Sequence, residues 1–147
     1  AGTYTMISAK KVNGAWNIYS TLNDGKSHTE TIVLSTAKEN YANYSHLGAG
    51  NDLKDATKNG FILGTTNFNG YVAWDRQCLN CILQYGGTNY PLEWTGNRQS
   101  VICNKCKRVY SLENGTITSG GQGKEDKMLM QYRVTYTGIG SVLTVGN

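Results

Sequence analysis

The sequence has little of what marks multidomain, membrane-spanning or nucleic-acid-binding chains. Its 147 residues include one proline, and no Pro-, Gly- or Ser-rich linker divides them, so we expect one domain that is large enough to bury a hydrophobic core. No apolar run approaches the roughly 20 residues of a membrane-spanning helix. The net charge is only +4, without a block of like charges that would suggest a nucleic-acid-binding tail. These absences favour a single domain without a membrane span.

Recognisable catalytic motifs are also missing. No Ser, His and Asp set stands in a familiar context, and the Gly-rich "GGQG" before Lys124 lacks the strand and helix that a phosphate-binding loop requires. The chain has two histidines, His28 and His46, which lie far upstream of the cysteines. We interpret both as ordinary surface or strand residues. The sequence therefore gives little support to an enzyme.

The residues that are present predict a mostly β fold. Charged residues make up 16%, glycines number 18, and ten tyrosines stand against two phenylalanines, a composition typical of turn-rich β-proteins. Apolar alternation and turn residues predict strands at 3–9, 15–20, 28–34, 60–64, 71–74, 92–94, 100–102 and 108–112, and a terminal hairpin within 128–145. The one helical pattern covers 35–48, with a capping box at Thr36 and Glu39.

Four cysteines form the strongest motif. Cys78-x-x-Cys81 is followed by 21 residues and then by Cys103-x-x-Cys106. Two such pairs next to short strands can direct four thiolates at one ion, and their spacing lies close to that of zinc ribbons. An all-sulfur tetrahedral site favours zinc or iron over magnesium or calcium. The sequence thus predicts a metal site.

Two other uses of the cysteines stay open. An exported protein could form two disulfides, although a bridge within either pair closes a very small loop and constrains the chain little. A thioredoxin-like redox pair needs its cysteines at the start of a helix in a βαβ setting. We expect the first pair to lie in a loop, and neither pair precedes a helical pattern, which disfavours this second use.

The segments around the cysteines are basic. One interpretation is a ribbon that binds phosphates or single-stranded nucleic acid, with bases stacked on Trp74, Trp94 or Tyr110. The other is charge compensation, because a dication held by four thiolates is a dianion that nearby cations stabilise. We favour the second interpretation, so nucleic acid is not the expected partner. The basic residues are Arg76, Arg98, Lys105, Lys107 and Arg108, against the acidic Asp75 and Glu93.

Three stretches together resemble a known family. "GYVAWDRQCLNC", "ICNKCKRVYSLENGTITSG" and "MLMQYRVTYTGIGSVLTV" place a strand before a first ligand pair, a second pair before a short strand and turn, and a closing hairpin last. This order resembles a Rieske iron-sulfur domain and, more narrowly, the Rieske-like envelope lipoproteins of Bacteroidetes. The resemblance covers roughly residues 60–147.

The resemblance implies a fold and a changed ligand set. It implies a single Rieske-like antiparallel β-sandwich over residues 1–147, with a rubredoxin- or zinc-ribbon-like metal-binding subdomain at 75–112 and one short helix. A Rieske centre binds one of its irons through two histidines, but Cys81 and Cys106 stand where those histidines are expected. The "SGGQGKEDK" loop also lacks the proline-containing segment that shields a Rieske cluster. We therefore expect four thiolates in place of the mixed set.

These observations lead to two functional hypotheses. The first is a non-enzymatic cell-envelope protein in which the cysteines bind a structural zinc ion, which has no redox chemistry and no open coordination position here. The second is an electron carrier with iron, as one ion or a [2Fe-2S] cluster, on the same sulfurs. The resemblance places the protein in the periplasm or at the outer membrane, with a protein or envelope component as partner. The first residues "AGTYTMISAKK" contain neither an initiator methionine nor a signal peptide, so any lipid anchor would lie upstream.

Overall fold

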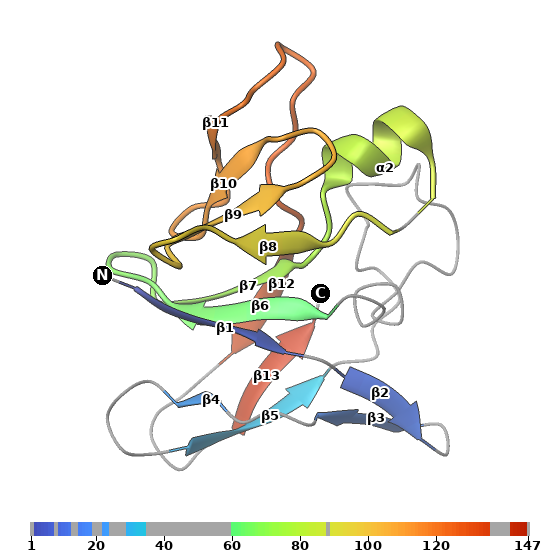
Figure 1. Cartoon of the computed structure of the whole chain (residues 1–147). Helices are drawn as coiled ribbons and strands as arrows, with labels where there is room; N and C mark the ends of the chain where they lie inside the picture. Colours follow the sequence, from blue (N-terminus) through green and yellow to red (C-terminus); the bar gives the residue numbers. More distant parts are fainter. Residues whose placement is uncertain are drawn as a thin grey trace.

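The structure is a computed structural model that describes residues 2–7, 9–12, 15–18, 22–23, 29–34, 60–87, 89–135 and 142–146, with side chains only in 2–6, 60–87 and 89–135. The fold is mostly β, with one short helix among the described residues (Figure 1). Its elements in chain order are β1 Thr3–Ile7, β2 Ala9–Val12, β3 Ala15–Ile18, β4 Leu22–Asn23, β5 Thr29–Leu34, β6 Phe61–Thr65, β7 Tyr71–Asp75, α2 Leu79–Tyr85, β8 Leu92–Trp94, β9 Ser100–Cys103, β10 Val109–Ser111, β11 Ile117–Ser119, β12 Gln131–Thr135 and β13 Val142–Gly146.

The described strands form two main sheets and a separate hairpin. Seven strands pair in the order β1-β6-β7-β12-β13-β5-β4, and four pair in the order β11-β10-β9-β8, while β2 pairs with β3. The pairs are antiparallel except for β13 with β5, which run parallel. Figure 1 shows the four-stranded sheet and α2 together above the seven-stranded sheet.

Most of the predicted strands are confirmed. β6 and β7 match the predicted strands at 60–64 and 71–74, and the terminal hairpin is present as the antiparallel pair of β12 and β13. The predicted strand at 3–9 is divided into β1 and β2. The predicted helix at 35–48 lies outside the described residues, as do both histidines.

β6 and β7 form the framework beneath the cysteines. Phe61, Ile62 and Leu63 are successive residues of β6 and all are buried, so this part of the sheet is covered on both faces. In register with them, Ile62 stands opposite Trp74 of β7. Because β7 ends at Asp75, this buried strand delivers the chain to the first cysteine three residues later.

The main core lies between β6–β7 and the four-stranded sheet. Trp74 is almost completely buried and its indole N–H donates to the Leu112 carbonyl at 3.1 Å. Gly115 packs against the same ring: its φ is +78°, and a Cβ at this position would lie 2.8 Å from a Trp74 carbon, a conformation that glycine adopts at least cost. Three of the four cysteines belong to this core, and Cys106 packs against it.

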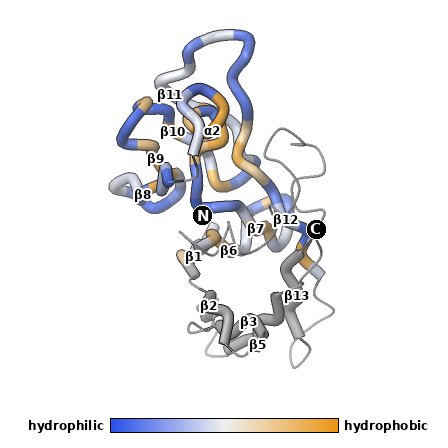
Figure 2. Tube along the Cα trace, turned by 90° about the vertical axis from the view of Figure 1, so that its right-hand side faces the viewer, coloured by the Kyte–Doolittle hydropathy of each residue, from blue (hydrophilic) through white to orange (hydrophobic). Residues whose placement is uncertain are grey.

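The helix and the loop near it differ in hydropathy. Figure 2 shows hydrophobic stretches in α2 next to hydrophilic ones, whereas the loop that follows β11 is mostly hydrophilic. Among the described residues, no helix combines the length and the apolar character that crossing a membrane requires.

Candidate metal centre

The fold brings the four predicted ligands together. The sulfur atoms of Cys78, Cys81, Cys103 and Cys106 all lie within 4.8 Å of one another. The closest contacts join the two pairs, with 3.7 Å from Cys78 Sγ to Cys106 Sγ and 3.6 Å from Cys81 Sγ to Cys103 Sγ. A tetrahedral ion with metal–sulfur bonds of about 2.3 Å has sulfur–sulfur edges of ~3.8 Å. The sulfurs therefore already stand close to the spacing of a tetrahedral site.

The four cysteines are free thiols. A disulfide would require sulfur atoms about 2.05 Å apart, much closer than the contacts of 3.6 and 3.7 Å. The two disulfides that the sequence left open are thus not present in this structure. The arrangement is compatible with a metal ion. Zinc and iron both accept four thiolate ligands, so the arrangement fits either ion.

The first pair does not lie in a loop, and that prediction is wrong. Cys78 occupies the N-cap position of α2 with extended dihedrals (φ −81°, ψ 105°), and Cys81 lies within the first turn of the helix. The helix forms because Leu79 and Ile82 follow helical spacing and bury against the core. Gly86, with φ +75°, ends it, and the Gly86 N–H donates to the Ile82 carbonyl at 2.9 Å.

The first pair does lie at the start of a helix, as a thioredoxin-like redox motif requires. Other features of the site still disfavour that interpretation. The pKa of Cys78 is raised, because it shares a hydrogen bond with Cys103 and because it is buried, whereas a reactive redox cysteine needs a lowered pKa. The setting also differs, because α2 joins β7 to β8 in another sheet rather than connecting two parallel strands. The thioredoxin-like interpretation stays disfavoured for these reasons.

The second pair lies in a β-hairpin. Cys103 ends β9 and Cys106 lies in the turn before β10. The Lys107 N–H donates to the Cys103 carbonyl at 2.7 Å, and the Cys103 N–H donates to the Arg108 carbonyl at 3.0 Å. The turn requires a left-handed residue, which is Lys107 with φ +68°.

A polar network that joins β10, α2 and the 120–127 loop reaches the sulfur of Cys78. Asn80 fixes its direction: its carbonyl oxygen accepts the Lys127 N–H at 2.8 Å, so its amide nitrogen is the donor to the Tyr110 hydroxyl at 2.8 Å. The phenol then has its own proton for Cys78 Sγ, 3.0 Å away. Tyr110 therefore donates an O–H···S hydrogen bond, which favours the thiolate that a metal needs.

Convergence changes the proton affinity of the thiols. The pKa of Cys103 is lowered to about 4, mainly by a hydrogen bond with the Cys78 thiol and also by the backbone N–H groups of Cys106 and Lys105. Burial raises the pKa of Cys81 to about 12. One sulfur is thus stabilised as a thiolate at the expense of its neighbours. A dication at the centre would favour ionisation of all four, so metal binding releases protons and weakens in acid.

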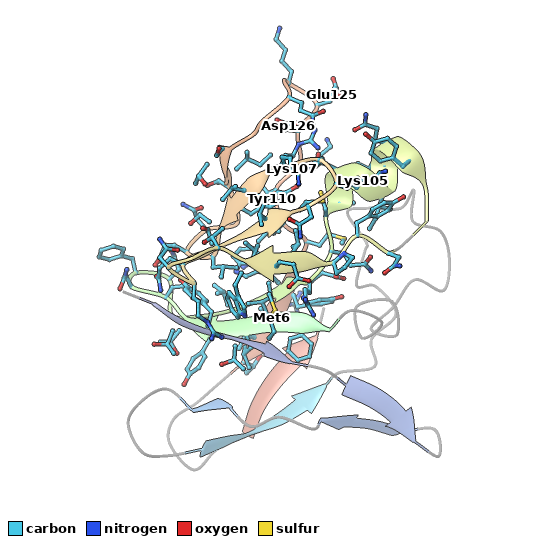
Figure 3. The ribbon with its side chains drawn as sticks, viewed as in Figure 1. Met6, Lys105, Lys107, Tyr110, Glu125 and Asp126 are labelled. Carbon is cyan, nitrogen blue, oxygen red and sulfur yellow. The ribbon has the colours of Figure 1, made fainter. Side chains whose placement is uncertain are left out.

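The loop at residues 120–127 is bonded to both elements that hold the cysteines. Asp126 accepts from Arg108 Nε at 3.0 Å and from Arg108 Nη2 at 2.8 Å. Lys127 and Asn80 exchange two hydrogen bonds of 2.8 Å, because Asn80 Nδ2 also donates to the Lys127 carbonyl. Figure 3 shows Asp126 and Tyr110 in the upper part of the molecule, where this loop meets the four-stranded sheet. The loop is therefore tied both to α2 and to the hairpin.

The structure defines the setting of each of the five basic residues near the cysteines. Arg76 pairs with Glu93 at 2.9 Å, Arg98 lies over the Trp94 ring, and Lys105 lies over the Tyr85 ring. Lys107 is exposed in its turn. Only Arg108, among the basic residues that the structure describes, is buried beside a cysteine, Cys106.

The aromatic residues give little support to a nucleic-acid interface. Trp74 and Tyr110 are buried at 2% and 0% exposure, so neither can stack on a base. Trp94 is partly exposed, but Arg98 lies 4.4 Å from the centre of its ring. Two of the three proposed stacking residues are therefore core residues.

A cavity of about 420 Å³ lies between α2 and the 120–127 loop. Its lining residues are polar or charged apart from Leu83 and Gly123, and the four cysteines are not among them. It is lined by Asn80, Leu83, Gln84, Arg108, Gln122, Gly123, Lys124, Glu125, Asp126 and Lys127.

Sequence reasoning missed the helix at the first pair and the role of Asn80. The signal for the helix was present: Leu79, Ile82 and Leu83 follow the i, i+3, i+4 spacing, and the pair Gly86-Gly87 could end it. No local signal marks Asn80, because its partners Tyr110 and Lys127 lie 30 and 47 residues away.

The geometry stands without support from relatives. Comparison of the chain with protein-family models, with curated proteins and with solved structures gave no match.

Proposed function

We propose that this chain is a non-enzymatic protein in which Cys78, Cys81, Cys103 and Cys106 bind one structural zinc ion. The observation that carries the proposal is the convergence of four free thiols within 4.8 Å, at contacts close to the edges of a zinc–thiolate tetrahedron. Four protein ligands leave no open position for a substrate or an activated water. The ion would join α2 to the β9–β10 hairpin, two elements from different parts of the core.

Elemental analysis combined with a visible spectrum tests this proposal directly. The protein is purified without air and without a metal-affinity step, so that neither oxidation nor the resin changes the metal content. About one zinc per chain and no visible absorbance is the expected result. A metal-free preparation whose thiols still react in full with a thiol reagent would contradict it, because the folded site should then have retained its ion.

An iron electron carrier is the second candidate, and one observation favours it. Tyr110 donates an O–H···S hydrogen bond to Cys78, and the backbone N–H groups of Lys105 and Cys106 favour the thiolate of Cys103. Hydrogen bonds to ligand sulfurs are one of the means by which proteins set the potential of iron–sulfur centres. The anaerobic preparation distinguishes the candidates, because stoichiometric iron with visible absorbance would replace zinc.

We also propose a Rieske-like fold and a cell-envelope location for this chain. Supporting the fold are the order of a strand before the first pair, a hairpin that contains the second pair, and a closing β12–β13 hairpin. The envelope location, the lipid anchor and an envelope component as partner rest on the sequence resemblance alone. Fractionation of native cells with an antibody against the chain tests the location, and recovery in the cytoplasmic fraction would contradict it.

A further inference from the structure

Arg108 is a buried cation next to the proposed metal centre. It is 5% exposed and follows Cys106 by two residues. Its carbonyl accepts the Cys103 N–H at 3.0 Å, so its backbone belongs to the hairpin that holds the second cysteine pair. Burial of a charge is costly unless partners offset the lost hydration. The partners of the guanidinium therefore indicate which interactions stabilise the buried charge of Arg108.

Asp126 holds one edge of the Arg108 guanidinium. Arg108 Nε and Nη2 both donate to Asp126 Oδ1, at 3.0 and 2.8 Å. The other carboxylate oxygen accepts the backbone N–H groups of Gln122 and Gly123 at 2.7 and 3.2 Å. Because Asp126 is itself fixed by the 120–127 loop, it sets the plane in which the guanidinium lies.

The third nitrogen faces away from Asp126. Arg108 Nη1 is buried and has no hydrogen-bond partner in the structure, an arrangement that costs about 1–3 kcal/mol for a buried donor. Desolvation opposes the charge, yet hydrogen bonding and attraction to Asp126 and Cys106 raise the pKa of Arg108. Cys106, two residues earlier in the same hairpin, is the cysteine close enough to contribute to this rise, and no partner is recorded for Nη1. A thiol is a weak acceptor and a thiolate a strong one.

The neighbouring cations do not compete for this role. Arg76 is engaged by Glu93 Oε1 and also donates to the Leu92 carbonyl at 2.7 Å. It stands two residues before Cys78, just as Arg108 stands two residues after Cys106, but the recorded partners of its side chain are a carbonyl and a carboxylate, not a cysteine. Arg76 is therefore a matched control with the same charge at a similar position in the sequence.

We propose that Arg108 is the counter-charge of the four-cysteine centre, donating from Nη1 to the thiolate of Cys106 while Asp126 holds its orientation. This inference rests on the proposed metal-binding function. A divalent ion with four thiolates is a dianion in a largely buried position, and a fixed guanidinium beside it lowers the cost of that charge. Arg108 is a positioning and charge-balancing residue, not a ligand.

Two substitutions separate charge from structure. Arg108→Gln and Asp126→Asn both break the same ion pair, but the first removes the positive charge and the second keeps it. Zinc affinity is measured for the full chain by competition with a chromophoric chelator, with Arg76→Gln as the control. We expect Arg108→Gln to lose ~10-fold or more in affinity, the range typical for partners of metal ligands. Arg76→Gln should change it by less than ~3-fold. Asp126→Asn should not weaken it, because the side-chain oxygen of Asn can still accept from Arg108 while a negative charge beside the centre is removed.

The reduction potential of the iron-loaded protein gives a second measurement. Removal of a nearby cation destabilises the reduced, more negative centre, so Arg108→Gln should lower the potential. Asp126→Asn should raise it, and Arg108→Lys, which keeps the charge, should lie between Arg108→Gln and the wild type. A purely structural ion pair gives no reason for shifts of opposite sign. This comparison also applies if Arg108→Gln folds poorly, because Arg108→Lys and Asp126→Asn still have opposite expectations.

The outcomes distinguish this inference from the proposed function. A wild-type chain that binds neither zinc nor iron overturns the proposed function and this role with it. A wild type that binds metal, while Arg108→Gln behaves like Arg76→Gln, overturns the role of Arg108 alone. Equal losses in Arg108→Gln and Asp126→Asn would mean that the ion pair only anchors the loop, which also overturns it.

Discussion

The two cysteine pairs have the same spacing and are built by different local structures. Cys78 and Cys81 lie at the start of the seven-residue helix α2, whereas Cys103 and Cys106 lie in a hairpin whose strand β9 is paired with β8 and β10. The helix has no side-chain hydrogen bond at its N-cap, no acidic residue in its first turn and no basic residue in its last. The hairpin is fixed by backbone hydrogen bonds on both sides. The comparison suggests that one pair is preformed and the other depends on its surroundings.

The largest expected effect comes from removing one ligand of either pair. Cys81→Ser and Cys103→Ser should each reduce zinc affinity by on the order of 100-fold or more, because a tetrahedral site needs all four thiolates. Both should also lower the melting temperature, since binding free energy contributes to folding. Metal analysis and thermal unfolding measure the two effects. An unchanged melting temperature and metal content in Cys103→Ser would refute a structural zinc site.

Removal of the metal should affect the two pairs unequally. Helices shorter than ~12 residues are marginal on their own, so chelation should speed amide hydrogen exchange in α2 by at least ~10-fold. Amides of β9 should keep most of their protection, because β8 and β10 continue to pair with it. Hydrogen exchange by mass spectrometry before and after chelation measures both. Equal loss in α2 and β9 would mean that the hairpin is no more preformed than the helix.

Tyr110→Phe should be the next largest change. It removes the hydroxyl that bonds Cys78 and leaves the Asn80 amide with one partner fewer, so we expect a loss of about 1–3 kcal/mol in the free energy of unfolding. Tyr90→Phe is the control, because its hydroxyl bonds the exposed Gly86 carbonyl and should cost at most ~0.5 kcal/mol. Urea denaturation of the zinc-loaded proteins compares them. Equal effects would show that the bond to Cys78 has no special weight.

The smallest expected effect has opposite signs in the two pairs. Lys107 has φ +68°, which is unfavourable for a residue with a Cβ, so Lys107→Gly should stabilise the protein by up to ~1 kcal/mol. Gln84 is an exposed residue of α2, where glycine should destabilise by about 1 kcal/mol. Urea denaturation gives both values. A destabilising Lys107→Gly would show that the left-handed turn is not strained.

Much of the framework could be predicted from local sequence. The apolar runs of β6 and β7, the turn between them, and the short strands around the second pair all come from patterns that span only a few neighbouring residues. The Cys-x-x-Cys spacing also predicted which four residues would converge, since each pair separated by two residues can supply two ligands to one ion. These features depend on neighbours in the chain, which the sequence displays directly.

The first pair shows where local reasoning failed. Strand β7 leads into "DRQCLNC", and the expectation of a loop there ignored the apolar spacing of Leu79 and Ile82. That spacing stabilises a helix only when Leu79 and Ile82 can pack against the core, because an isolated seven-residue helix is marginally stable. Met130, which joins Leu79 and Ile82 in one buried cluster, lies about fifty residues further along the chain.

By itself, the sequence determined that this chain is mostly β and that Cys78, Cys81, Cys103 and Cys106 are the candidate ligands. Tertiary structure alone decided what surrounds the sulfurs: the Tyr110 hydroxyl on Cys78, to which Asn80 donates, and the ion pair of Arg108 with Asp126 beside Cys106. The physical reason is distance in the chain. Spacing of a few residues is governed by local geometry, whereas hydrogen bonds and ion pairs between residues 18 to 47 positions apart exist only after the core has brought their elements together.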